Sequence, residues 1–86
     1  MEYLNAKIVG FVIQKTREQK GLSQEVVSGL ADIGRTHLSA IERGARKPTL
    51  ETFFRIADAL GMPASRLMEK VERAIDDGKG CQNGCI

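Results

Sequence analysis

The sequence predicts an all-α fold, a compact five-helix bundle formed as one domain. Apolar residues recur at helical spacing along most of the 86 residues, and no segment alternates polar and apolar residues as a half-buried strand would. Glycine or proline separates the periodic segments, at Gly21, Gly44, Pro48, Gly61 and Pro63, where helices end or begin. Hydrophobic residues make up 42% of the chain, which suffices for one small core, and we expect no second, ligand-sensing domain.

Residues 5–20 are expected to form the first helix, with Gly21 as its C-terminal stop. The positions that recur at helical spacing and can face the core are Val9, Ile13, Thr16 and Arg17. A second apolar stripe on a neighbouring face consists of Leu4, Ile8 and Phe11. A solvent-facing surface would not need this stripe, so we expect it either to pack against the C-terminal helix or to form a subunit contact.

Residues 23–43 are expected to contain two short helices joined by a tight turn. Ser23 can cap the first, residues 24–31, and Gly44 can end the second, residues 35–43, in a left-handed conformation. Asp32, at the start of the turn, tolerates the left-handed conformation.

This segment has the pattern of the helix-turn-helix motif of DNA-binding proteins. The pattern combines a small residue at 28 and a turn former at 32 with apolar residues at 27, 31, 33, 38 and 41. Periodicity alone would also permit a helical hairpin without a nucleic-acid role, but the tight-turn constraints favour the motif.

Two further helices are expected after Pro48, which cannot continue a helix. Thr49 can cap the fourth, whose expected buried positions are Leu50, Phe53, Phe54, Ala57 and Leu60. Pro63 can open the fifth, whose apolar stripe is Leu67, Met68, Val71 and Ile75.

Residues 78–86, GKGCQNGCI, contain three glycines and no apolar period, so we expect the domain to span residues 1–77 and the rest to be a flexible tail. Cys81 and Cys85 lie in this tail, and the single histidine, His37, lies in the third helix. A metal site would need further ligands within reach, so we expect no bound metal and no cofactor. Paired acids, a phosphate loop or a nucleophile beside a base cannot be identified, and an enzyme is not expected.

The positive charge is concentrated in one segment. Residues 33–49 carry a net charge of +3, whereas residues 1–32 are neutral and residues 50–77 carry −2. The basic residues of that segment are Arg35, Arg43, Arg46 and Lys47. Such a cluster on one helix and the loop after it suits the phosphates of DNA. No segment approaches the ~20 apolar residues of a membrane span, and no signal peptide is recognised, so a cytoplasmic location is expected.

Most of the chain resembles the Cro and phage-repressor type of helix-turn-helix protein, also called the XRE family. The resemblance covers residues 9–68 and is carried by the run LSQEVVSGLADIGRTHLSAIERGARKPTLETFFRIADALGMP. It implies a lambda-repressor-like bundle of five helices that binds double-stranded operator DNA, usually as a symmetric dimer.

The resemblance also implies that the third helix lies in the major groove. The positions implied to reach base edges are Arg35, Thr36 and Ala40. Those implied to contact the DNA backbone are Gln24, His37, Arg43, Arg46 and Lys47. Arg17 and Glu42 match a structural ion pair of the family. The sequence departs from the family pattern at Asp32, where glycine is common, and at Gly34, where serine or threonine usually caps the recognition helix.

The sequence therefore predicts a sequence-specific transcriptional regulator that acts as a homodimer on an inverted-repeat operator. The alternative is a protein-interaction module, such as an antitoxin, that binds a toxin-like protein partner and regulates its own synthesis through DNA. We expect the dimer to bury surplus apolar surface at the two ends of the chain, namely Leu4, Ile8, Phe11, Leu67, Val71 and Ile75.

Overall fold

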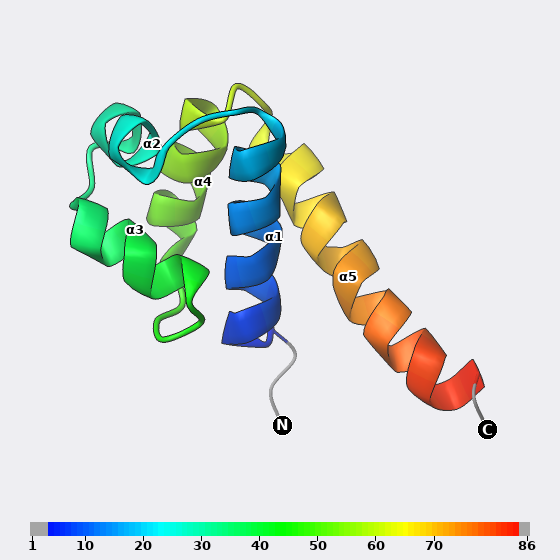
Figure 1. Ribbon diagram of the computed structural model, residues 1–86. Coiled ribbons are helices and arrows are strands. Elements are labelled where there is room, and N and C mark those ends of the chain that lie inside the picture. The colour runs from blue at the N-terminus through cyan, green and yellow to red at the C-terminus, as the bar shows by residue number, and fades with distance from the viewer. Residues whose placement is uncertain (1–3, 85–86) are drawn as a thin grey trace.

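The structure, a computed structural model, describes the backbone of residues 4–84 and the side chains of residues 4–77. The described part contains five helices and no strand (Figure 1). The helices are α1 (Ala6–Gln19), α2 (Gln24–Ala31), α3 (Arg35–Glu42), α4 (Leu50–Ala59) and α5 (Ala64–Gly84). The predicted all-α fold with five helices is confirmed.

The helix boundaries follow local signals in the sequence. Ser23 and Thr49 are the N-caps of α2 and α4, and each side-chain oxygen accepts a backbone N–H bond of 3.1 Å. Gly21, Gly44 and Gly61 follow α1, α3 and α4 with φ between +71° and +78°. Glycine adopts this left-handed conformation without steric cost, so these residues end the three helices where the sequence predicts.

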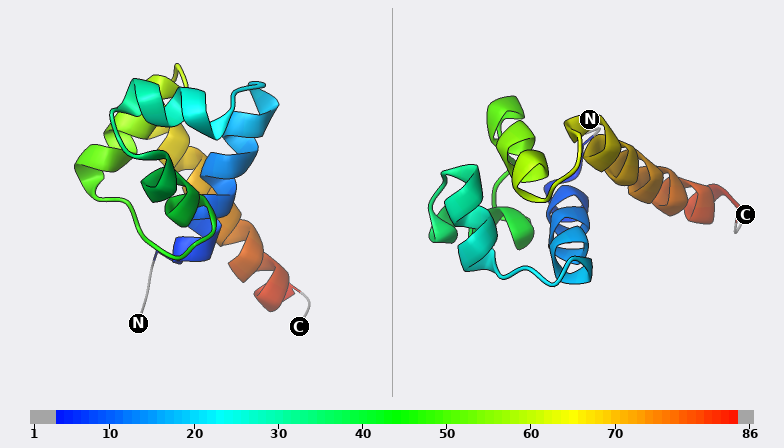
Figure 2. Two further views of the ribbon diagram at one scale, coloured as in Figure 1. Left: turned by 60° about the vertical axis from the view of Figure 1, so that its left-hand side comes forward. Right: turned by 90° about the horizontal axis from the view of Figure 1, so that it is seen from above.

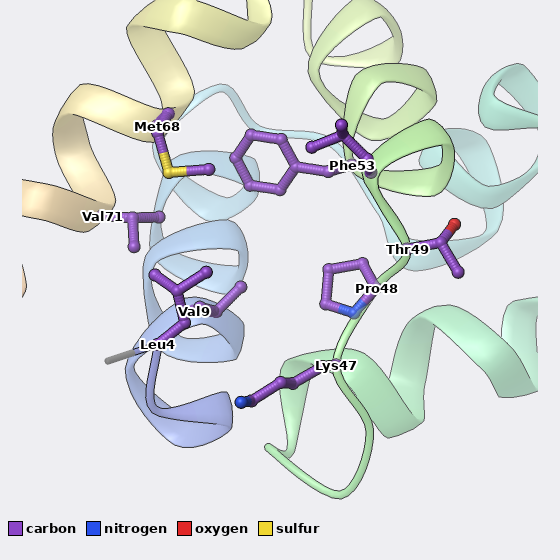
Figure 3. Close-up of a pocket in the computed structure, with 9 residues that line it drawn as sticks. Leu4, Val9, Lys47, Pro48, Thr49, Phe53, Met68 and Val71 are labelled. Carbon is purple, nitrogen blue, oxygen red and sulfur yellow. The ribbon is translucent and has the colours of Figure 1, made fainter. Parts of the chain in front are cut away.

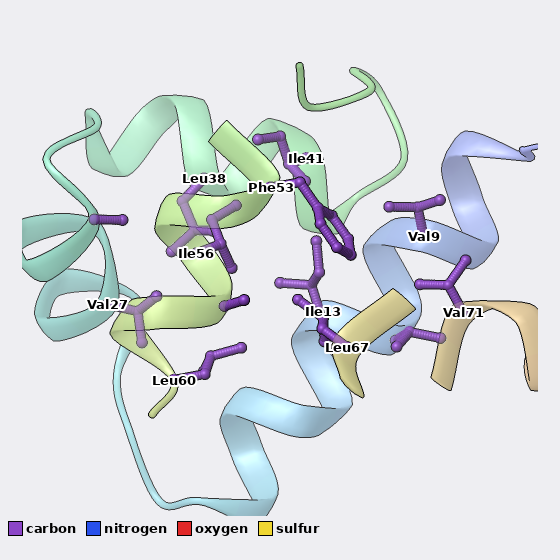
Figure 4. Close-up of a cluster of buried hydrophobic side chains, with 13 residues drawn as sticks. Val9, Ile13, Val27, Leu38, Ile41, Phe53, Ile56, Leu60, Leu67 and Val71 are labelled. Carbon is purple, nitrogen blue, oxygen red and sulfur yellow. The ribbon is translucent and has the colours of Figure 1, made fainter. Parts of the chain in front are cut away.

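One apolar core joins all five helices (Figure 4). Its largest fully buried side chains are Ile13, Val27, Leu38, Ile41, Ile56, Leu60, Leu67 and Val71. Within it, α1 packs against α3 and α5, α2 packs against α3 and α4, and α4 packs against α5. The two helices of the predicted motif are therefore held by contacts from α1 and α4.

The prediction for the buried face of α4 is wrong at two positions. Leu50 is 75% exposed and Phe54 is 61% exposed, whereas Phe53 and Ile56 are buried. The apolar residues of α4 form two overlapping stripes at helical spacing, and contact with α2 and α5 selects the one that contains Phe53 and Ile56.

The predicted dimer surface needs a second correction. Leu67 and Val71 have no exposed surface, because α5 packs against α1 and α4 of the same chain. They are part of the domain's own core and cannot meet a second copy. On the other end of the chain, Ile8 is half-buried against this core, whereas Leu4 and Phe11 are exposed.

The last turns of α5 extend away from the bundle (Figures 1 and 2). The backbone remains helical through Gly84, although the sequence predicts a tail without regular structure from residue 78. Each added residue of an existing helix gains one backbone hydrogen bond, which is the physical reason for such an extension. The side chain of Cys81 and the whole of Cys85 lie outside the described residues.

Candidate nucleic-acid interface

A turn of three residues sets the angle between α2 and α3. Asp32 has φ 58° and ψ 45°, the left-handed conformation that the sequence predicts. The backbone N–H of Ile33 donates to the carbonyl oxygen of Ser28 at 3.0 Å, and the half-buried Ile33 side chain packs against the core. Ser28 itself is buried, as expected for a small residue at this position. α2 and α3 thus form a helix-turn-helix.

The outward face of α3 carries the residues predicted to reach bases. Leu38, Ile41 and Glu42 are buried and define the inner face of the helix. Arg35 and Thr36 are exposed at the start of α3, and Ala40 is half-buried one turn further on. Because Leu38 and Ile41 anchor the opposite side, this face points away from the core and is accessible to a macromolecule.

Ser39 belongs to the same face, although the sequence analysis did not single it out. It lines a shallow hollow together with Arg35 and Thr36. Its spacing of four residues from Arg35 is the signal that could have identified it, since residues four apart are neighbours on a helix surface.

Basic side chains surround this face. Arg43 and Arg46 are exposed in the segment that leaves α3, and His37 is half-buried on the helix itself. Lys47 is also exposed, and Figure 3 shows its ammonium group pointing toward the start of α1. The structure therefore places the predicted backbone-contacting cations at the end of α3 and in the loop that follows.

The one acidic residue of α3 points into the fold. Arg17 Nε donates to Glu42 Oε2 at 2.7 Å and Arg17 Nη2 donates to Glu42 Oε1 at 3.0 Å, so the pair is bidentate. The Arg17 and Glu42 side chains are only 11% and 2% exposed. The hydrogen bond to Glu42, ahead of other causes, raises the pKa of Arg17, which therefore stays charged at any pH at which the protein would be handled. The carboxylate is thus neutralised internally and does not oppose the cations on the outer face.

Gln24, predicted to contact the DNA backbone, takes part in the same cluster. Its amide nitrogen donates to Glu42 Oε1 at 2.9 Å. Arg17 Nη1 also donates to the carbonyl oxygen of Leu22 at 2.8 Å, in the segment that enters α2. These bonds tie α1, the start of α2 and the end of α3 to one buried carboxylate.

Gly10 is a further residue that positions α3. A methyl group in its place would overlap the carbonyl oxygen of Ile41 and lie 2.7 Å from the carbonyl oxygen of Glu42. Only glycine lets α1 approach the α3 backbone this closely. A glycine in the middle of a helical segment was the available signal, because such a residue often marks a close contact.

Across the described residues, no three His, Cys, Asp or Glu side chains are arranged to hold a metal ion. No helix in this part of the chain has the length and apolar character needed to cross a membrane.

The fold and the α2–α3 geometry define a helix-turn-helix protein, and comparisons with known proteins agree. The sequence model of the helix-turn-helix family matches residues 13–67. The uncharacterized HTH-type transcriptional regulator y4dJ of Sinorhizobium fredii is 41% identical over 56 residues, which cover 65% of this chain and 73% of that protein. The control protein C.MunI of Mycoplasma sp is 35% identical over 65 residues, covering 74% and 88% of the two chains.

Solved structures of restriction-modification controller proteins are similar as well. C.AhdI from Aeromonas hydrophila superposes with a TM-score of 0.71 at 31% identity, over 76% of this chain and 98% of that chain. C.Esp1396I, solved as a tetramer on its natural 35 base-pair operator, gives a TM-score of 0.78 at 31% identity over 86% and 97% of the chains. This chain belongs to the helix-turn-helix family of transcriptional regulators, of the XRE type.

Proposed function

We propose that this protein regulates transcription by binding a specific double-stranded operator through the outward face of α3, as a dimer on an inverted repeat. The observation that carries the proposal is the charge arrangement of α3. Arg35 and Thr36 are exposed on the outer face with Arg43 close behind, while Glu42 is buried and paired with Arg17. A helix with this arrangement presents cations and hydrogen-bonding groups, without an opposing carboxylate, to a DNA groove.

Each residue of the face has a role that its chemistry allows. The Arg35 guanidinium can donate two hydrogen bonds to O6 and N7 of guanine, and the methyl groups of Thr36 and Ala40 can contact a thymine methyl. The cations around the face, His37 included when it is protonated, can pair with phosphates; they are His37, Arg43, Arg46 and Lys47. Gln24 donates one amide hydrogen to Glu42 and has a second one that can bind a phosphate.

The assembly part of the proposal rests on the size of the face. α3 has 8 residues, so one copy can contact only a few base pairs, and useful affinity is reached by pairing two half-sites. The related controller C.Esp1396I binds its operator as a tetramer, which supports an assembly of this kind. The relatives reported above are named as regulators or control proteins and lend no support to the antitoxin alternative.

Selection of bound sites from a random duplex pool, followed by fluorescence anisotropy across a salt series, tests the proposal. Arg35→Ala should cost ~1–3 kcal/mol on the selected site and much less on random DNA. Arg46→Ala should weaken binding to both and lower the salt slope by about one unit. Arg66→Ala, an exposed arginine on α5, serves as the control and should change little. Failure to enrich any sequence, or equal losses for Arg35→Ala and Arg66→Ala, would contradict the proposal.

A further inference from the structure

Two large apolar side chains protrude from one side of α4. Leu50 and Phe54 lie one helical turn apart, and both are more than half exposed. They border two apolar hollows that share Leu50, Phe53 and Met68 in their linings. One hollow continues to Ala64 at the start of α5, and the other continues to Leu4 and Val71 (Figure 3). Protruding side chains and adjacent hollows thus occupy a single surface.

We propose that this surface, the α4–α5 patch of Leu4, Leu50, Phe54 and Met68, is where a second copy of this chain binds. The inference rests on the dimer of the proposed function and assigns its contact surface. It replaces the surface predicted from the sequence, because Leu67 and Val71 are buried within one chain.

The size of the patch fits the apolar centre of a dimer interface. Leu4, Leu50 and Phe54 are 40%, 75% and 61% exposed. At roughly 200 Å² for a whole large apolar side chain, these fractions amount to about 350 Å² for each copy. A stable interface buries ~800 Å² on each partner, with a more apolar centre in homodimers. The patch would supply nearly half of that area.

The shape of the patch favours a second copy over an unrelated partner. A two-fold interface brings the same surface of both copies together, so that surface must carry both the protruding groups and the hollows that receive them. The α4–α5 patch has both, since Leu50 and Phe54 stand beside the hollows floored by Phe53 and Met68. A two-fold axis here can place the Leu50 and Phe54 side chains of each copy against the hollows of the other.

Covering this patch also leaves α3 accessible. α3 packs against α1 and α2, whereas the patch lies mainly on α4 and α5. Two recognition helices one DNA turn apart are separated by roughly 34 Å, so each must lie about 17 Å from the two-fold axis. The two shorter extents of the molecule are 22 and 19 Å, and a contact across the bundle from α3 is compatible with that spacing.

A second exposed apolar pair, Val26 and Leu30 on α2, provides a matched control. Leu30 is 65% exposed, close to the 61% of Phe54, but it lies on the motif and not on the patch. Sedimentation equilibrium of the full chain without DNA should show a dimer at micromolar concentration. Phe54→Glu and Leu50→Glu should each raise the dimer dissociation constant by at least roughly 100-fold, since each change occurs twice in the interface. Leu30→Glu should leave it unchanged.

All three substituted positions are exposed, so the variants should fold, and circular dichroism melts verify this. A monomeric wild type at these concentrations, a dimeric Phe54→Glu variant, or dissociation by Leu30→Glu would each overturn the inference. Anisotropy on a duplex with one half-site separates this outcome from the proposed function. Phe54→Glu should bind that half-site as the wild type does and lose affinity only for the complete repeat. If the wild type binds no DNA sequence preferentially while Phe54→Glu still abolishes the dimer, the regulator proposal fails and the interface assignment stands.

Discussion

Gly10 offers the sharpest test of how α3 is held, because it joins α1 to the recognition helix without a side chain of its own. An alanine methyl at this position would overlap the carbonyl oxygen of Ile41 and lie 2.7 and 2.9 Å from the carbonyl oxygen and carbon of Glu42. All three neighbours are backbone atoms, which cannot rotate away as the end of a flexible side chain could. The substitution must therefore push α1 and α3 apart.

The size of the effect follows from two opposing contributions. Alanine is favoured over glycine in the interior of a helix by ~0.5–1 kcal/mol. Overpacking a buried contact typically costs ~1–3 kcal/mol, and the separation of two helix backbones lies at the upper end of that range. Gly10→Ala should therefore lower the free energy of unfolding by a net ~1–2.5 kcal/mol.

Gly29 is the matched control, because it is an exposed helical glycine with no atom within 4 Å of an added methyl. Gly29→Ala should raise stability by ~0.5–1 kcal/mol through helix propensity alone. The two alanine variants should then differ by ~2–3 kcal/mol, or on the order of 10 °C or more in melting temperature for a domain of this size. Urea unfolding followed by circular dichroism measures the difference directly. A Gly10→Ala variant as stable as Gly29→Ala would refute the close approach of α1 and α3.

Two further outcomes are expected from denaturant unfolding. Glu42→Ala should cost ~3–5 kcal/mol because it strands the buried Arg17 charge, whereas Glu69→Ala, which removes an exposed partner of Arg73, should change stability by less than ~0.5 kcal/mol; equal small losses would show that the Arg17–Glu42 pair is not desolvated. Gly34→Ser should stabilise the domain by ~0.5–1 kcal/mol, because Gly34 has ordinary extended dihedrals and open space for a side chain, and serine can cap α3; an unchanged midpoint would contradict it.

The boundaries of the helices could be predicted because their signals are local. Ser23 and Thr49 cap helices, and Asp32 and Gly44 adopt left-handed conformations, for reasons contained within a few residues of each position. Arg17 and Glu42 are 25 residues apart, so no local rule joins them. Only the resemblance to a family could suggest that pair from the sequence.

Positions whose environment depends on the packing of distant segments could not be predicted. Phe53 and Phe54 are adjacent and equally apolar, and only the contact of α4 with α2 and α5 decides that Phe53 is buried and Phe54 is exposed. Val71 has the same ambiguity in the opposite direction, since its stripe suits a subunit contact as well as the core. Gly10 is a similar case, because its backbone contact with Ile41 is invisible to any pattern along α1.

The two ends of α3 are held very differently, and this bears on how variants of this protein should be interpreted. An isolated helix of 8 residues is not stable in water, so tertiary contacts must maintain α3. They act chiefly at its C-terminal end, where Gly10 contacts the backbone and Arg17 and Gln24 bind Glu42. At the other end, no side chain caps Gly34.

Arg35, next to that uncapped end, is exposed, and its side chain makes no hydrogen bond or ion pair within the described part of the chain. A substitution near Glu42 must therefore disturb the fold and any DNA binding together, because the same contacts orient the whole helix. A substitution at Arg35 leaves those contacts in place. Loss of sequence preference in Arg35→Ala, with an unchanged melting temperature, would accordingly report on the contact with DNA and not on the stability of the domain.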